Sequence, residues 1–178
     1  FNYIGDQDII RIINDGAYIG SIYRAASSHN SFLVTEQCNH YCLMCSQPPK
    51  KIDDSFLLEE IKKAIPLIPK DTHEIGFTGG EPTLFGNKFL DILNMTKSYL
   101  PNTSIHILSN GRTFAQHDFV RKYAEINHHD MMVGIPLYSD DAQLHDYIVQ
   151  SKGAFDETIL GILNLKKLKQ KVEIRIVI

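Results

Sequence analysis

The chain has 178 residues, 43% hydrophobic and 22% charged, which is enough for one sizeable globular core. Its formal net charge of −3 gives no general attraction to nucleic acid, so we expect no nucleic-acid partner. No segment approaches roughly 18 uninterrupted apolar residues, and the N-terminus lacks the basic and apolar regions of a secretion signal. We therefore expect no membrane association and a cytoplasmic location.

The first thirty residues predict a β-hairpin. Two short apolar runs, residues 8–13 and 17–23, flank an Asn-Asp-Gly sequence at 14–16, which is a strong turn signal. We place this hairpin in an N-terminal extension of residues 1–30, ahead of a main domain of residues 31–178. Because the chain does not begin with methionine and ends within an apolar run, we expect it to be a segment of a longer protein.

Beyond residue 30, strand and helix signals alternate. The expected strands, rich in valine and isoleucine, are Phe32–Thr35, Glu74–Thr78, Ser104–Ser109, Met131–Leu137 and Val172–Ile178. The expected helices are Ser55–Ile68 with Ser55 as its N-cap, Lys88–Tyr99, Gln116–Ile126 and Phe155–Lys169. Repeated β-α-β units predict an α/β fold with a parallel sheet, either open and doubly wound or closed into a complete or partial β/α barrel.

The only three cysteines form a Cys-x3-Cys-x2-Cys array at Cys38, Cys42 and Cys45, after the first strand. An odd number of thiols within eight residues favours a metal or cluster site over disulfides. A structural zinc site would need His40 or His29 as its fourth ligand, although we expect His40 to be an exposed loop residue. An ordinary four-cysteine cluster would need another thiol. A three-cysteine [4Fe–4S] cluster would leave one iron open to a small chelating molecule.

Two further loops follow the second and third strands. In Gly79-Gly80-Glu81-Pro82, adjacent glycines allow the backbone to approach a ligand, and the Glu81 carboxylate suits an ammonium group. A tight turn with a solvated glutamate is the alternative. Ser109-Asn110-Gly111 is equally typical of a plain turn. Because ligands of both β/α architectures gather where strands end, we expect these loops and the cysteine array to share one site.

Two later segments leave their interpretation open. Leu144-His145-Asp146, after the fourth strand, is typical of a loop or of the start of a helix. Arg175 is the one cation in an apolar final run. It either points into a barrel mouth toward a carboxylate or faces solvent.

Taken together, these motifs resemble the radical S-adenosylmethionine (SAM) superfamily over roughly residues 31–178. The resemblance rests on the cysteine array after Val34-Thr35-Glu36, on the GGEP and Ser-Asn-Gly loops in order, and on Gly153-Ala154-Phe155-Asp156. More narrowly, the chain is similar to the maturases of the His-Xaa-Ser repeat peptide system. The residues that carry this similarity are Asn30, Val34-Thr35-Glu36, Cys45-Ser46-Gln47-Pro48-Pro49-Lys50 and Gly134-Ile135-Pro136-Leu137-Tyr138-Ser139.

The resemblance implies a partial (β/α)6 barrel of TIM type that ends here after its fifth strand. It also implies a [4Fe–4S] cluster whose open iron binds SAM. A flavodoxin-like or ferredoxin-like donor would supply the electron that cleaves SAM to methionine and a 5′-deoxyadenosyl radical, which takes hydrogen from the substrate. The narrower similarity implies a ribosomally made peptide as the substrate. The alternatives are a small molecule, a tRNA base, or a zinc or iron–sulfur module without catalysis.

The resemblance also implies roles for single residues. The cluster ligands, on which catalysis depends, are Cys38, Cys42 and Cys45. The SAM-binding residues are Met44 beside the adenine, Gly79, Gly80 and Glu81 along the methionine part, and Ser109 facing the barrel interior. Many relatives contact the ribose through a serine where this sequence has Pro136, and Ser139 would then replace that serine.

Overall fold

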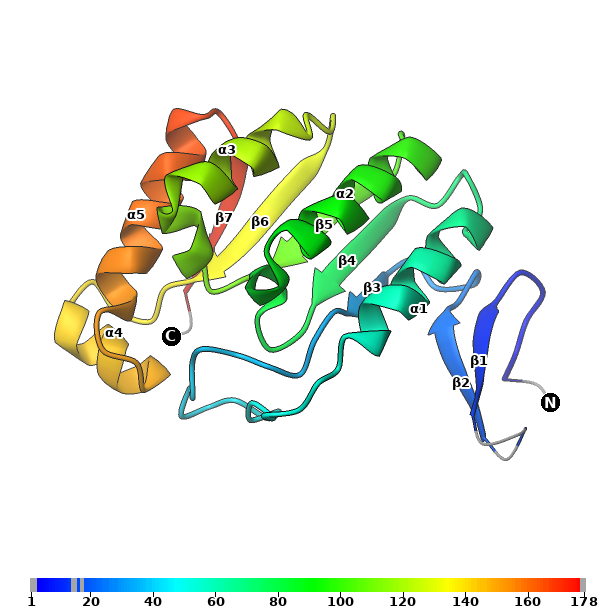
Figure 1. Ribbon diagram of the computed structural model, residues 1–178, viewed down its shortest axis with the longest axis horizontal. Helices are drawn as coiled ribbons and strands as arrows, with labels where there is room; N and C mark the ends of the chain where they lie inside the picture. Colours follow the sequence, from blue (N-terminus) through cyan, green and yellow to red (C-terminus); the bar gives the residue numbers. More distant parts are fainter. Residues whose placement is uncertain (1–2, 14–15, 17, 177–178) are drawn as a thin grey trace.

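The predicted N-terminal hairpin is confirmed. The structure is a computed structural model that describes residues 3–13, 16 and 18–176. Strands β1 (Ile9–Ile13) and β2 (Tyr18–Tyr23) pair antiparallel, and Figure 1 shows them beside β3 and α1. Asn14, Asp15 and Ala17, which belong to the predicted turn and second run, lie outside the described residues.

The five later strands form one parallel sheet. They are β3 (Asn30–Leu33), β4 (Glu74–Thr78), β5 (Ser104–Leu108), β6 (Met131–Pro136) and β7 (Lys171–Arg175). Their spatial order is β3-β4-β5-β6-β7, so the described part of the sheet has no reversal of strand order of the kind that defines a doubly wound sheet. The fold is therefore α/β with a partial β/α barrel, as predicted.

Helices connect the strands and cover one face of the sheet (Figure 1). The α-helices are α1 (Phe56–Ala64), α2 (Asn87–Tyr99), α3 (His117–Glu125), α4 (Ala142–Val149) and α5 (Ala154–Lys167). Short 3-10 helices are η1 (Ile65–Leu67), η2 (Pro82–Phe85) and η3 (Arg112–Ala115). Among the described helices, none has the length and apolar character needed to cross a bilayer.

The two faces of the sheet differ in character. Alternate strand residues are apolar and fully buried against the helices, and they include Ile75, Phe77, Ile105, Ile107, Val133 and Ile135. Burying each such side chain contributes about 1.5–3 kcal/mol to folding. Residues between them on the opposite face, such as Gly76, His106 and Gly134, are small or polar. This second face forms the interior of the partial barrel.

The first helix is shorter than predicted, and Ser55 occupies its N-cap position as predicted. Pro66 has no N–H to continue the α-helical hydrogen bonds, so α1 ends at Ala64 and a 3-10 turn follows. Ser55 already has helical backbone angles, and among the described residues its side chain makes no capping hydrogen bond. The side chain of Asp53 accepts a hydrogen bond from the Ser55 N–H instead, at 3.1 Å.

Two other boundaries differ for physical reasons. The first main strand ends at Leu33 rather than Thr35: the Val34 N–H still bonds to the Thr78 carbonyl, but the Thr35 side chain then bonds to Asp54. The Leu144-His145-Asp146 segment is part of the complete helix α4, which the prediction of four helices omitted. Its start is capped by Asp141, whose side chain accepts a hydrogen bond from the Leu144 N–H at 2.8 Å.

Candidate functional site

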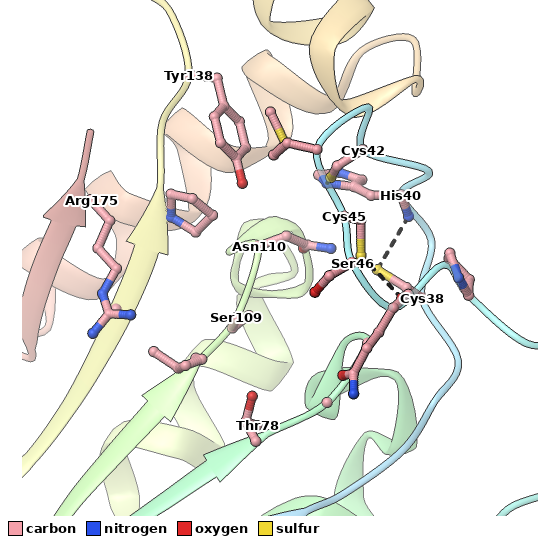
Figure 2. A pocket seen from close by; sticks show the side chains of 18 residues that line it. Cys38, His40, Cys42, Cys45, Ser46, Thr78, Ser109, Asn110, Tyr138 and Arg175 are labelled. Carbon is pink, nitrogen blue, oxygen red and sulfur yellow. Dashed lines mark hydrogen bonds between the residues drawn. The ribbon is translucent and has the colours of Figure 1, made fainter. Parts of the chain in front are cut away.

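A cavity of about 420 Å³ opens at the carboxyl ends of the sheet strands. Thr78, Leu108, Pro136 and Arg175, from the ends of β4, β5, β6 and β7, line it together with the loop that follows β3 (Figure 2). Pro136 is paired with Arg175 across β6 and β7. The volume lies within the range of small-molecule and cofactor sites.

All three cysteines line this cavity. Cys38 and Cys42 are half-buried, whereas Cys45 is exposed. Burial raises the pKa of Cys38 to about 11 and also raises that of Cys42, so these two thiols are protonated at neutral pH when no cluster is bound. In residues 3–13, 16 and 18–176, no group of three His, Cys, Asp or Glu side chains is arranged to hold a metal ion. Each thiol makes its own contact instead, such as that of the Cys45 sulfur to the Gln47 carbonyl at 3.0 Å.

The donor set nevertheless fits an open iron–sulfur cluster better than zinc. Three thiols share one cavity wall, and the sequence contains no fourth cysteine. His29 precedes β3 whereas the cysteines follow it, and its ring lies beside Glu74 at 3.5 Å, so it is wrong as a zinc ligand. A structural zinc site is closed, whereas these thiols adjoin a cavity large enough for a second ligand.

His40 is buried, which contradicts the prediction of an exposed loop residue. Only 4% of its surface is exposed, and its Nδ1 lies 3.9 Å from the sulfur of Cys42. Burial, together with the nearby charge of Arg112, lowers the pKa of His40 to about 4. His145 on α4 is buried too, and burial lowers its pKa. Both imidazoles are therefore neutral at pH 7.

Asp54 anchors the start of the cysteine loop, a role that the sequence did not reveal. Its buried carboxylate accepts hydrogen bonds from Thr35 Oγ1 at 2.9 Å, from the Glu36 N–H at 2.5 Å and from Gln37 Nε2 at 3.0 Å. Burial raises the pKa of this carboxyl, but these donors outweigh burial and hold the pKa below its usual value. Residues 35–37 lead directly into Cys38, so Asp54 positions the first cysteine.

The GGEP turn packs directly on the cysteine loop. The Gly80 N–H donates to the Thr35 carbonyl and the Glu81 N–H to the Gln37 carbonyl, both at 2.8 Å. A Cβ on Gly79 would stand 2.5 Å from the Thr35 oxygen, and one on Gly80 would clash with the Gln37 carbonyl. The two glycines therefore bring the turn against the cysteine loop as well as lining the cavity.

The Glu81 carboxylate lies in a buried hydrogen-bond network. It is fully buried and, among the described residues, is not part of the cavity wall. It accepts hydrogen bonds from the N–H and hydroxyl of Thr83, from the Ser109 hydroxyl at 2.8 Å and from the Asn110 N–H at 2.6 Å. Burial raises the pKa of this carboxyl, and the four donors oppose the rise. Glu81 thus positions Ser109 and Asn110, which do line the cavity.

The loop after β5 holds the cysteine loop from a second side. Asn110 Nδ2 donates to Asn39 Oδ1 at 2.7 Å, and Arg112 Nη1 donates to the Asn39 carbonyl at 3.1 Å. The Arg112 guanidinium is itself fixed by Ser151 at 2.9 Å and by Glu157 at 2.5 Å. Asn39 lies between the first two cysteines, so these contacts fix the interior of the array.

Helix α4 provides a third support through its last turn. The Tyr41 N–H donates to the Val149 carbonyl at 3.0 Å, and the Leu43 N–H donates to the Ile148 carbonyl at 2.9 Å. These carbonyls belong to the end of a helix, where they lack intrahelical partners. The helix that sequence reasoning missed is therefore one of the elements that shape the cysteine loop.

Of the remaining predicted site residues, some line the cavity and one does not. Met44, Ser109 and Pro136 line the cavity. Ser139 is outside the wall formed by the described residues, because its hydroxyl accepts a hydrogen bond from the Asp141 N–H at 3.0 Å in the turn before α4. Arg175 lines the cavity, and its Nε donates to Glu173 at 2.9 Å.

Comparison with known structures identifies the same fold in other proteins. Native anSMEcpe with bound AdoMet and Cp18Cys peptide is 20% identical, with a TM-score of 0.58 over 81% of this chain and 42% of that one. Methylornithine synthase (PylB) is 17% identical, with a TM-score of 0.61 over 82% of this chain and 43% of that one. Streptococcus suis SuiB bound to S-adenosylmethionine is 16% identical, with a TM-score of 0.60 over 82% of this chain and 31% of that one. The chain thus spans less than half of each structure. No curated protein sequence matches it.

A comparison with sequence families is more specific. The profile described as the Radical SAM superfamily matches residues 32–178, which include the cysteine array, the GGEP turn and all five strands of the parallel sheet except the start of β3. The same segments surround the cavity. The chain therefore belongs to the radical SAM superfamily, whose members use a [4Fe–4S] cluster and S-adenosylmethionine.

Proposed function

We propose that this chain is the catalytic core of a radical SAM enzyme that matures a ribosomally made peptide of the His-Xaa-Ser type. One observation carries the radical SAM assignment: the GGEP turn is hydrogen-bonded to Thr35 and Gln37, which lead into the cysteine array, and the turn and the array line one cavity. The cluster, when bound, supplies the electron that cleaves SAM to methionine and a 5′-deoxyadenosyl radical. The chain itself binds, orients and shields the reacting groups.

Each wall of the cavity has a separate task in this proposal. Cys38, Cys42 and Cys45 would hold the cluster and leave one iron without a protein ligand. Gly79 and Gly80 would line the methionine part of SAM, and Met44 would contact the adenine. Ser109 would face the interior, where the Glu81 carboxylate holds its hydroxyl. These tasks agree with the cavity lining, in which all except Glu81 take part.

Three observations support a peptide as the substrate. The finer sequence similarity is to peptide maturases, and one structure of the same fold contains a bound peptide. The cavity wall also includes Met44, which is 50% exposed, and the exposed Cys45. The cavity therefore opens to solvent on the side of the cysteine loop, where an extended substrate has access.

A small-molecule substrate is the second candidate. The specific observation in its favour is the comparable likeness to methylornithine synthase, with a TM-score of 0.61. Because the fold is shared by both kinds of enzyme, only a substrate assay separates them.

The first experiment tests the radical chemistry. We expect the full-length protein, reconstituted anaerobically with iron and sulfide and then reduced with SAM present, to release 5′-deoxyadenosine. Cys42→Ala should abolish both the cluster and this release, whereas His29→Ala, at the opposite end of β3, should leave both intact. A spectroscopically well-formed cluster that releases no 5′-deoxyadenosine would contradict the radical assignment. Retained release in Cys42→Ala would show that the ligands are wrong.

The second experiment tests the substrate. We expect mass spectrometry to show a changed mass in a peptide with His-Xaa-Ser repeats, and no change in a scrambled peptide of the same composition. Release of 5′-deoxyadenosine without any peptide modification would favour the small-molecule candidate.

A further inference from the structure

Two buried histidines, His40 in the cysteine loop and His145 on α4, each have a nitrogen without a partner in the described part of the chain. His40 is 4% exposed and His145 is 1% exposed, and the Nε2 atom of each is buried without a hydrogen-bond partner among the described residues. His145 lies one helical turn before Val149 on α4, and both are buried on the same face. The Tyr41 N–H bonds to the Val149 carbonyl, so the backbone next to His40 lies at the last turn of the helix that carries His145. Unpaired buried polar atoms are costly, so this pair requires an explanation.

The hydrogen bonding of His145 determines which nitrogen carries its proton. Its Nδ1 accepts a hydrogen bond from the Tyr138 N–H at 3.3 Å. A nitrogen that accepts cannot hold a proton, so the hydrogen of the neutral ring is on Nε2. The unpaired Nε2 of His145 is therefore a donor.

The neighbouring sulfur determines the proton position on His40. Its Nδ1 lies 3.9 Å from the sulfur of Cys42, and Figure 2 shows the two residues side by side. A cluster ligand is a thiolate, which can only accept. His40 must then donate through Nδ1, so its Nε2 is a bare acceptor. A buried acceptor on His40 thus complements a buried donor on His145.

We propose that His145, His40 and the Cys42 thiolate form a hydrogen-bonded chain, with His145 Nε2–H donating to a buried water that donates to His40 Nε2, and His40 Nδ1–H donating to the sulfur. This inference rests on the cluster of the proposed function. A hydrogen bond to a cluster sulfur stabilises the more negative, reduced cluster and raises its reduction potential. His40 is thus a positioning residue that acts through Cys42.

The test is a redox titration that measures the midpoint potential of the cluster in the full-length, reconstituted protein without SAM. Electron paramagnetic resonance monitors the reduced cluster. We expect His40→Leu to lower the potential by about 59 mV, which is a tenfold change in the ratio of reduced to oxidised cluster for a one-electron couple. His40→Asn should keep the wild-type potential, because its amide nitrogen stands near the position of Nδ1. His40→Gln places its amide near Nε2 and should lower the potential as His40→Leu does.

A matched control separates this effect from general loss of a histidine. His128 also has a buried Nε2 without a partner among the described residues, but it precedes β6 at the opposite end of the sheet. We expect His128→Leu to leave the potential unchanged. Equal potentials in the wild type, His40→Asn and His40→Gln would overturn the proposal.

A measurement on the wild-type chain keeps the proposal falsifiable if the His40→Leu cluster does not assemble. Nitrogen-15 NMR should place the His145 proton on Nε2, and a proton on Nδ1 would overturn the hydrogen-bonded chain. His145→Leu should lower the potential less than His40→Leu, because it removes only the partner of His40. Since no SAM is present, a cluster that shows these shifts but never cleaves SAM would contradict the proposed function alone.

Discussion

Gly80 shows how a single missing side chain builds the site. Its N–H bonds to the Thr35 carbonyl at 2.8 Å, and a Cβ there would stand 3.0 Å from the Cβ of Cys38 while clashing with the Gln37 carbonyl. The clash is with backbone, which cannot rotate away. Any larger residue must therefore separate the GGEP turn from the cysteine loop.

We predict that Gly80→Ala lowers the free energy of unfolding by about 1–3 kcal/mol, the usual cost of overpacking. It should also reduce the iron retained after reconstitution, because Cys38 moves with the loop. Urea unfolding and iron analysis measure the two effects. Gly20→Ala on β2 is the control, since a Cβ there meets only the flexible Arg11 side chain at 3.5 Å. Equal effects of the two substitutions would contradict the steric argument.

The cysteine loop is the element that carries the chemistry, yet it has little regular secondary structure. It is held instead by Asp54 at its start, by Asn110 and Arg112 in its middle, and by the last turn of α4. Figure 1 shows it running past the strand ends toward α4. Its shape depends on these hydrogen bonds, so each of them is a place where the site can be weakened.

We predict that Asp54→Asn lowers the free energy of unfolding by about 1–3 kcal/mol, because a buried amide group would face the donors of Thr35, Glu36 and Gln37. Cluster content should fall as well. The adjacent Asp53→Asn is a matched control: Asp53 is exposed, and an asparagine oxygen can still accept from the Ser55 N–H. Chemical denaturation and iron content, compared for the two variants, provide the measurement. An Asp54→Asn protein as stable as Asp53→Asn would refute the anchoring role.

The junction between α4 and α5 predicts a pH dependence. The Asp146 carboxylate accepts hydrogen bonds from the N–H groups of Gly153 and Phe155; burial raises its pKa, but these bonds outweigh burial and lower the pKa overall. A lowered pKa means that the folded state favours the charged form. The contribution to stability is then present above the unfolded pKa of about 3.9 and is lost as the pH falls through the lower folded pKa.

We therefore expect Asp146→Asn to lose less stability than the wild type as the pH falls from about 5 through the lowered pKa of the folded state. Thermal unfolding at a series of pH values measures the difference. Asp156→Asn, at an exposed position in the first turn of α5, should follow the wild-type curve. Parallel curves for Asp146→Asn and the wild type would disprove this contribution.

At the scale of the whole molecule, the site exists because the sheet order brings distant loops together. The cysteine loop follows β3, the GGEP turn follows β4 and the Ser-Asn-Gly loop follows β5, and these strands are neighbours in the sheet. Arg175, at the end of β7, completes the opposite side of the cavity. A ligand in this cavity contacts most of the sheet, so its binding is coupled to global folding.

We predict that SAM at a hundredfold excess over its dissociation constant raises the melting temperature of the cluster-loaded protein by roughly 5–11 °C. The expected stabilisation is about 2.7 kcal/mol in a domain of this size. Differential scanning calorimetry under anaerobic conditions measures it. The cluster-free protein and Cys42→Ala should show little shift, and an equal shift in them would mean that SAM binds without the open iron.

The sequence by itself determined the class of fold, the five main strands, four of the helices and the order of the motifs. These properties depend on short-range patterns: alternation in strands, a 3.6-residue period in helices, and motifs within a few residues. The errors in predicting helices also had local causes: Pro66 ends α1 earlier than predicted, and α4 is so short that its pattern was missed. Strand order, which distinguishes a barrel from a doubly wound sheet, is not local, and only the structure decided it.

Only the tertiary structure decided what individual polar side chains do. Asp54 holds Thr35 from 19 residues away, and Asn110 holds Asn39 from 71 residues away. Glu81 belongs to a motif that predicted a ligand contact, but its carboxylate is buried in a network with Ser109. Burial and hydrogen-bond partners are set by segments that meet only after folding, which is why a motif identifies the site without assigning the work of each residue within it.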